Sequence, residues 1–358
     1  MKKAILALLL AGALLLTGCS AMLDRPYAAV SPHPEHPGTG EDDSTITVSS
    51  YPELVNAVLH FVSQTMEEGH ILLPDYDGDV VTDLNTACVE VAKDDPLGAY
   101  AVDFIQTEYT RVLTTYEATV SITYRRTPEQ VRSLVNVTGS SAIRRVLENA
   151  LAEFKPQVAL RVGYFAEDEA YIRALVRQAY CDTPAAALGM PEVTVSLYPE
   201  QGSQRVVEIL LQYGQPRDVL LERRTQVMAA AERLTAPLQE LPLGSEQLLS
   251  RLLALLPGQL TYTDQLLSDG SSPNTTWDAL VGGGGDDEGV ALAFRLLCDR
   301  LELDCAVTEG TLNGAPHIWN TLVVDDGTPL HVDLSRGDAP RTFTDEELTA
   351  LGYAWGEG

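Results

Sequence analysis

A histidine and an aspartate near the C-terminal end have the types and spacing of groups that activate a nucleophile. His317 lies in Ala-Pro-His-Ile-Trp-Asn (residues 315–320), and Asp333 lies in His-Val-Asp-Leu (residues 331–334). In acyl transfer, an imidazole removes the proton of a nucleophile, and a carboxylate holds that imidazole in the useful tautomer. The two residues therefore form two thirds of such a triad.

A predicted helix and three predicted strands must position these groups. A glycine run (residues 282–285) leads through residues 286–289 into an apolar helical pattern over residues 290–301. Strands are predicted over 305–309, 317–324 and 330–334, with turns at Asn313-Gly314 and residues 325–327. The expected local fold is a helix packed on an antiparallel sheet.

Residues 277–338 resemble the bacterial transglutaminase-like domain, a branch of the papain-like cysteine peptidase fold. In that family an aromatic-x-Ala-Leu-Val segment precedes a glycine-containing loop, and the catalytic cysteine begins a helix reading Cys-x-Gly-Tyr-Ala-x-Ala-Phe. His-Ala-Trp-Asn and His-Val-Asp follow on neighbouring strands. Here Ala-Leu-Val (279–281) fixes the register before the loop, and Glu-Gly-Val-Ala-Leu-Ala-Phe (288–294) fixes it after. The position of the cysteine therefore falls on Asp287 without a gap.

The resemblance implies a role for each retained residue. His317 matches the family histidine and Asp333 the acid that orients it, while Trp319 and Asn320 match their neighbours. We expect Trp277, Trp319 and Asn320 to contact a ligand. The resemblance extends more loosely over residues 245–358, including a family-like end at residues 343–355.

Asp287 changes the chemistry that this site can perform. A carboxylate keeps the negative charge that a helix N-terminus and a protonated His317 favour, but it lacks the polarisable sulfur. Cys298 lies 11 residues further along the same predicted helix, roughly 16 Å away, and cannot replace the missing thiol. Taken singly, a strand histidine and a turn aspartate are common structural residues.

We therefore predict a non-catalytic domain whose cleft binds an extended peptide or a cell-wall stem peptide. Two alternatives remain open. One is a hydrolase or acyl-transfer enzyme that uses Asp287, His317 and Asp333 without a thiol. The other is a purely structural envelope protein.

The N-terminal residues predict a targeting signal. Lys2 and Lys3 precede an apolar run over residues 4–16, which is shorter than the roughly 20 residues that span a bilayer. The following Leu-Thr-Gly-Cys (residues 16–19) resembles the bacterial lipobox, which implies cleavage before Cys19 and lipid attachment to its sulfur. We predict a signal peptide over 1–18, a flexible stalk over 19–44, and a lipid-anchored protein on the extracytoplasmic face of the cell membrane.

The middle of the chain predicts one α+β unit present twice. Each copy has an amphipathic helix opened by a serine pair, then a short strand, a second helix and two alternating strands. The matching segments are helices from Ser49-Ser50 and Ser140-Ser141, single strands 70–73 and 158–162, and strand pairs 102–112 with 115–124 and 193–197 with 205–212. The predicted architecture is α+β throughout: tandem αβαββ modules over 45–126 and 127–214, a helical connector over 215–242 and a transglutaminase-like domain over 243–358.

Composition argues against several partners. Asp and Glu number 51 against 24 Lys and Arg, giving a net charge of −27, so a nucleic-acid partner is not expected. No metal or cofactor is predicted: the acidic turn that begins at Asp75 has glycine at the fourth position of a calcium loop instead of the sixth and Thr86 where the loop needs glutamate, and the glycine run lacks a phosphate-loop lysine. Cys88, Cys181, Cys298 and Cys305 permit disulfides without requiring them.

Overall fold

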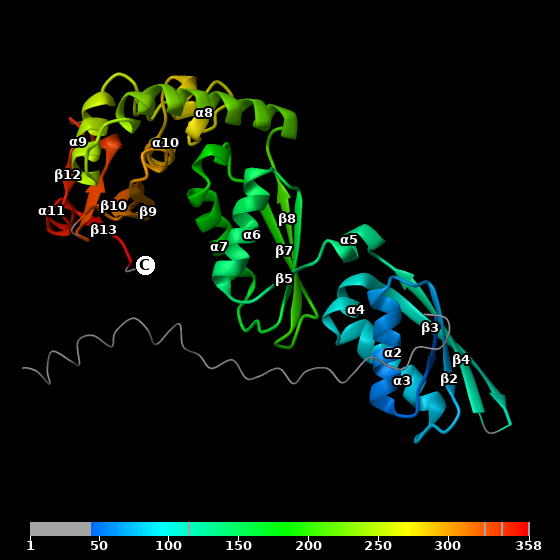
Figure 1. The fold of residues 1–358 in the computed structure, drawn as a ribbon. Helices are drawn as coiled ribbons and strands as arrows, with labels where there is room; N and C mark the ends of the chain where they lie inside the picture. Colours follow the sequence, from blue (N-terminus) through cyan, green and yellow to red (C-terminus); the bar gives the residue numbers. More distant parts are fainter. Residues whose placement is uncertain (1–43, 114, 326, 338, 357–358) are drawn as a thin grey trace, which may run out of the picture.

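The structure is a computed structural model that describes residues 44–113, 115–325, 327–337 and 339–356. The predicted signal peptide, Cys19 and all of the predicted stalk except Ser44 lie outside the described residues. Within the described part of the chain, no helix combines the length and apolar character needed to cross a membrane. The described residues form a mixed α+β fold with three sheets (Figure 1).

The first sheet has the strand order β1-β2-β4-β3. Strands β1 and β2 are parallel, and the β2–β4 and β3–β4 pairs are antiparallel. The elements are β1 (Thr45–Thr47), α2 (Tyr51–Ser63), β2 (Glu68–Leu73), α3 (Val80–Lys93), α4 (Pro96–Ala101), β3 (Val102–Val112) and β4 (Thr115–Tyr124). The predicted strand pair over 102–112 and 115–124 is confirmed.

The second sheet repeats this order and these directions as β5-β6-β8-β7. A short helix, α5 (Pro128–Arg132), connects the two units. The elements are β5 (Val135–Val137), α6 (Ser140–Ala152), β6 (Gln157–Val162), α7 (Glu169–Asp182), η1 (Pro184–Ala186), β7 (Glu192–Tyr198) and β8 (Arg205–Gln212).

Two details of the predicted units were wrong. Each unit begins with a three-residue strand, so its order is βαβαββ rather than αβαββ. Ser140 is the first residue of α6, and Gly139 with φ 80° precedes it, so Ser140 does not cap the helix. Ser50 does occupy the N-cap position of α2, but its side chain makes no capping hydrogen bond.

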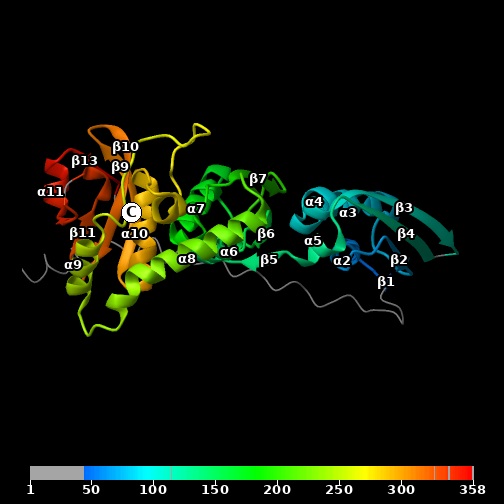
Figure 2. The ribbon, with the colours of Figure 1, turned by 90° about the horizontal axis from the view of Figure 1, so that it is seen from above.

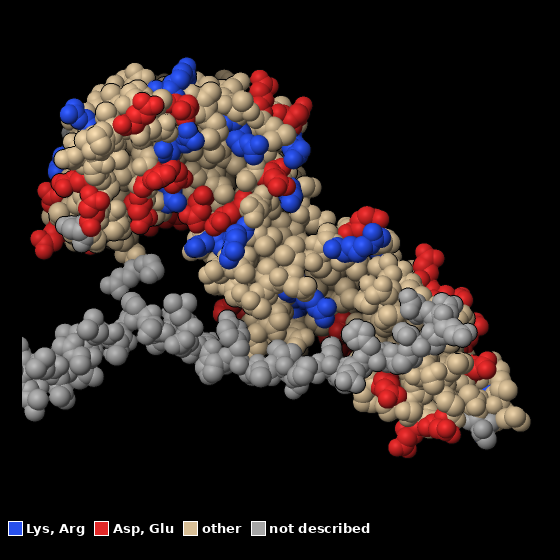
Figure 3. Space-filling view, in the orientation of Figure 1, with Lys and Arg blue, Asp and Glu red and all other residues tan. Residues whose placement is uncertain are grey.

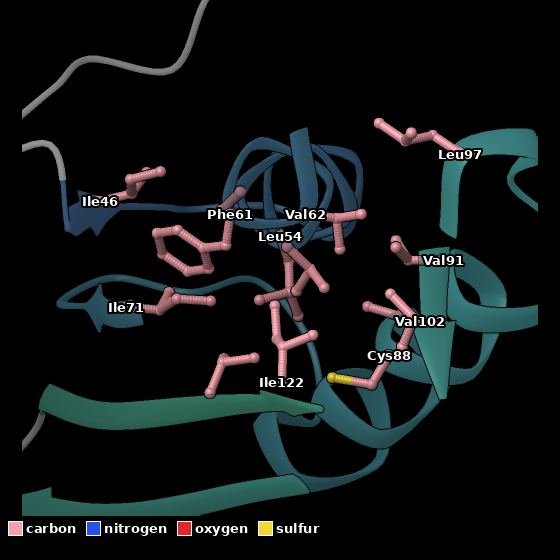
Figure 4. Close-up of a cluster of buried hydrophobic side chains, with 14 of the residues drawn as sticks. Ile46, Leu54, Phe61, Val62, Ile71, Cys88, Val91, Leu97, Val102 and Ile122 are labelled. Atoms are coloured by element: carbon pink, nitrogen blue, oxygen red, sulfur yellow. The ribbon is translucent and has the colours of Figure 1, made fainter. Parts of the chain in front are cut away.

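Alternating side chains explain how the first unit closes its core. Ala118, Val120 and Ile122 are buried on one face of β4, while the residues between them are less buried. Leu54 and Phe61 of α2 pack with them in one buried cluster (Figure 4). Full burial of each such aliphatic or aromatic side chain contributes about 1.5–3 kcal/mol.

A buried ion pair joins the first unit to the second. Arg126 Nη2 lies 2.6 Å from Glu208 Oε2, and Glu208 is 4% exposed. The guanidinium group of Arg126 also lies over the ring of Tyr100. Tyr100 in turn makes an edge-to-face contact with Tyr198 of β7. A buried carboxylate is stable here because a cation and hydrogen bonds compensate for its lost hydration.

A long helix, α8 (Arg217–Gln239), leads from the second unit to the C-terminal part and confirms the helix expected over 216–238. It contacts α9 (Ser245–Leu255) and α10 (Asp287–Arg300). Figures 1 and 2 show α8 running across both the second unit and α10.

The C-terminal sheet has the order β12-β11-β10-β9-β13 and is antiparallel. Helix α10 packs against its two central strands, as expected from the helical and strand patterns. The elements are β9 (Asp304–Leu312), β10 (Ala315–Val323), β11 (Pro329–Val332), η3 (Leu334–Arg336), β12 (Thr342–Phe343), α11 (Asp345–Ala350) and β13 (Tyr353–Ala354). Acidic residues are scattered over the face seen in Figure 3, with basic residues and uncharged stretches between them.

Candidate functional site

Asp287 is the first residue of α10, and a tight glycine turn places it there. A π-helical turn, η2 (Asp278–Gly282), ends at Gly283, whose φ of 101° favours glycine. A Cβ atom on Gly285 would lie 2.8 Å from the Cβ of Ala279, so a larger residue would push the turn away. Asp286 caps the helix by accepting a hydrogen bond from the Gly289 amide at 3.0 Å.

The sheet brings His317 and Asp333 to the same helix end. Strands β10 and β11 pair with Asn320 opposite Val332, which places Asp333 beside His317. His317 Nδ1 lies 3.0 Å from Asp287 Oδ2, and His317 Nε2 lies 2.8 Å from Asp333 Oδ2. The three residues selected from the sequence therefore converge in space, although convergence alone does not show a function.

Two further residues, not identified from the sequence, hold Asp333. The Tyr353 hydroxyl donates to Asp333 Oδ2 at 2.5 Å, and the Ser335 hydroxyl and amide donate to Oδ1 at 2.7 and 2.9 Å. Tyr353 belongs to a strand that pairs with β9 on the far edge of the sheet. Ser335 lies two residues after Asp333, which is the spacing of an aspartate turn. This spacing is the sequence pattern that could have predicted its contact with Asp333.

Burial and the two carboxylates act in opposite directions on His317. Burial by itself lowers the pKa of His317, but hydrogen bonds and attraction from Asp287 and Asp333 outweigh it and raise the pKa from 6.5 to about 9. Burial tends to raise the pKa of Asp287 and of Asp333, but hydrogen bonds, chiefly from His317, hold both below their usual value. At neutral pH the site is an imidazolium between two carboxylates.

The protonation of His317 decides whether it can act as a general base. A general base needs a ring nitrogen with a free lone pair within reach of the proton that it abstracts. Both nitrogens of His317 instead carry protons donated to carboxylates. The geometry resembles that of a nucleophile–histidine–acid triad. Asp287 occupies the place of the nucleophile and favours the protonated form of the imidazole.

Trp319 and Asn320 support the site from within the sheet. Both side chains are 1% exposed, so neither offers a surface to a ligand in this conformation. Asn320 Nδ2 donates to the Ala291 carbonyl of α10 at 3.0 Å and thereby fixes the helix on the sheet. Trp319 stacks near His317 and donates from Nε1 to His331 Nδ1 at 3.2 Å. Direct contact between a ligand and these two residues therefore stays a prediction.

His331 belongs to the same support and was not singled out from the sequence. Since the indole nitrogen of Trp319 can only donate, His331 Nδ1 accepts, and Nε2 carries the hydrogen shared with Asp345 at 2.7 Å. This second histidine–carboxylate pair anchors α11 to β11.

Trp277 lies away from the triad. Its Nε1 donates to Gln226 of α8 at 2.7 Å, and it lines a cavity to which none of the three triad residues contributes. Cys298 is fully buried in the core, and burial raises the pKa of its thiol, so it cannot act at this site. All four described cysteines are free and buried.

The three triad residues differ in exposure to solvent. The side chain of Asp287 is 28% exposed, that of His317 is 12% exposed and that of Asp333 is 1% exposed. Burial, followed by the charges of Asp264, Asp287, Asp286 and Asp333, raises the pKa of nearby Tyr262. Among the described residues, no group of three His, Cys, Asp or Glu side chains has the arrangement of a metal site.

An arginine of the second unit supports the residue after Asp287. Arg177 of α7 pairs with Glu288 of α10 and lies 2.5 Å from Glu309 of β9. Leu292 of α10 also packs into the core of the second unit. The start of α10 is therefore held from two sides, by its own sheet and by α7.

Comparisons with known proteins found only distant structural similarity. No protein-family model matches the chain, and no curated protein matches it. Solved structures similar to it include a crystal structure of a TGase, with a TM-score of 0.28 and 12% identity over 55% of this chain and 57% of that one. Another is a "putative protease" from Parabacteroides distasonis ATCC 8503, with a TM-score of 0.26 and 8% identity over 81% of this chain and 44% of that one. The chain thus spans less than two thirds of either structure.

Proposed function

We propose that the C-terminal part is a transglutaminase-like domain that binds peptides without cleaving or joining them, in a lipoprotein held at the outer face of a membrane through Cys19. The observation that carries the loss of catalysis is the contact of both His317 nitrogens with carboxylates, at 3.0 and 2.8 Å. The motif order around Asp287, His317 and Asp333 supports the family assignment. The Lys2–Cys19 sequence supports the anchor. The identical sheet orders support an origin of the two βαβαββ units by duplication.

The acidic residues near the triad suggest which peptides the proposed cleft accepts. Asp287 is the exposed member of the triad, and Asp264 and Asp286 lie close enough to act on the same tyrosine. A peptide that carries an amino group would gain from these charges, whereas an acidic peptide would be repelled. An amine-bearing peptide, such as a cell-wall stem peptide with a free side-chain amine, is therefore the proposed ligand.

Binding and turnover can be tested together with the purified full chain. We expect a dye-labelled N-acetyl-Ala-Lys-Ala amide to bind at least about tenfold more tightly than its Glu counterpart at low salt, as measured by fluorescence anisotropy. Asp287→Asn should weaken binding of the Lys peptide, while Asp304→Asn, at an exposed position, should leave it unchanged. Neither peptide should be hydrolysed or transferred.

Two outcomes would decide against this function. Turnover by the unmodified protein that disappears in His317→Ala would show that the site is an enzyme working without a thiol. Equal or undetectable binding of the two peptides, with no turnover, would favour a purely structural protein.

A further inference from the structure

A cavity of about 500 Å³ lies between the second unit, α8 and the loop before α10. That volume is typical of sites for small molecules. Its walls combine apolar side chains, Leu188, Met190 and Leu220, with polar groups from the 267–275 loop. No triad residue lines it, so it is separate from the cleft considered above.

A fixed arginine lies in the wall of this cavity. The guanidinium group of Arg223 stacks over the ring of Trp277, with 4.4 Å from its carbon to the ring centroid. The indole is itself held by the hydrogen bond from its Nε1 to Gln226. Stacking uses the face of a guanidinium group and leaves the N–H groups at its edge available for a planar acceptor.

The carboxylates that line the cavity are occupied by other donors. Asp278 Oδ2 accepts from the Thr275 hydroxyl at 2.6 Å and from its amide at 3.2 Å. Asp269 Oδ1 accepts from the hydroxyl and amide of Ser271 at 2.6 and 3.0 Å. In the part of the chain that the structure describes, Arg223 forms no ion pair with a carboxylate.

We propose that this cavity binds a small monocarboxylate with an apolar body, such as an N-acylated amino acid or the C-terminal residue of a peptide. The Arg223 edge matches the two oxygens of a carboxylate, and the apolar wall accommodates the rest of the ligand. A doubly charged phosphate would bring a second negative charge towards Asp269 and Asp278, so a carboxylate is preferred. This site is independent of the peptide-binding function proposed for the triad.

Isothermal titration of the full chain with N-acetyl-leucine tests the proposal. The matched probe is N-acetyl-leucine amide, which has nearly the same shape and no charge. We expect the acid to bind at least about tenfold more tightly than the amide, and Arg223→Gln to remove most of that difference. Arg233→Gln, an exposed position on the same helix, should bind the acid within about twofold of the unmodified protein.

Circular dichroism of each variant establishes that α8 is intact. Acid and amide binding equally, or no heat from the acid at millimolar concentration, would overturn the proposal. Tighter binding of phenyl phosphate than of N-acetyl-leucine would overturn the ligand class. If N-acetyl-leucyl-leucine binds with the same affinity as N-acetyl-leucine, the site is assigned to peptide C-termini. If only N-acetyl-leucine binds, the site is assigned to free acyl amino acids.

Discussion

Replacing His317 with alanine is expected to lower the free energy of unfolding by about 3 to 5 kcal/mol near pH 7, the usual cost of removing one partner from a buried ion pair. Asp333, with 1% of its side chain exposed, would lose the cation that compensates for its burial. Tyr353 and Ser335 would still donate to it, but neither carries a positive charge. Urea denaturation of the two proteins measures the difference.

The same comparison has a definite pH dependence. Because the pKa of His317 is raised from 6.5 to about 9 in the folded protein, its contribution to stability is complete below pH 6.5 and is lost as the pH rises through 9. A shift of this size corresponds to about 3 kcal/mol. The pKa values of Asp287 and Asp333 are lowered, so their contribution is present above the usual carboxyl value and is lost only in stronger acid.

His70→Ala provides the matched control for both measurements. His70 lies in β2 with 47% of its side chain exposed, and its contacts to exposed Glu68 at 3.5 Å and to Thr119 at 3.4 Å are long, so its removal should cost less than about 0.5 kcal/mol. Equal losses of unfolding free energy in the two variants would contradict the assigned pairing of His317 with Asp287 and Asp333. So would a difference in unfolding free energy between unmodified and His317→Ala protein that does not shrink from pH 6 to 9.

Replacing Asp287 with cysteine is expected to create a reactive thiol where the unmodified protein has none. The new sulfur would lie at the N-terminus of α10, beside His317 Nδ1 and near the Ile318 amide, which now donates to Asp287 at 3.1 Å. These groups favour the thiolate and lower its pKa. Alkylation by iodoacetamide at pH 6, located by peptide mass spectrometry, should be at least about tenfold faster than for an ordinary exposed cysteine.

Two variants complete that experiment. Asp304→Cys places a thiol at an exposed position away from the triad and supplies the alkylation rate of an ordinary cysteine. The double variant Asp287→Cys with His317→Ala should be alkylated at close to that rate. The four described native cysteines should stay unlabelled in folded protein, because they are buried and burial raises the pKa of Cys88 and Cys181 to about 12. If the single and double variants react equally, His317 does not activate this position.

The triad was predicted because its residues match, in order and spacing, the motifs of the family that residues 277–338 resemble, and local patterns place these residues on their elements. A glycine run before an apolar helix fixes Asp287 at a helix start, and alternating strands with short turns fix the pairing of β10 with β11. Strand β4 was equally clear, since its buried residues alternate with less buried ones.

The remaining features depend on contacts distant in sequence. Strand β1 has three residues and forms only through parallel pairing with β2, so it leaves little local signal. Tyr353 reaches Asp333 because β13 adds to the sheet beside β9, which no local pattern specifies. The protonation of His317 likewise follows from two carboxylates that meet only in the folded chain.

The pKa of His317 tests the central claim most directly. In protein with labelled histidine, NMR titration of the His317 ring should give a midpoint at about pH 9, with protons on both Nδ1 and Nε2 at pH 7. His70 in the same sample serves as the exposed reference. A midpoint for His317 near 6.5, with one unprotonated ring nitrogen at pH 7, would mean that a general base is available and would contradict the proposed loss of catalysis.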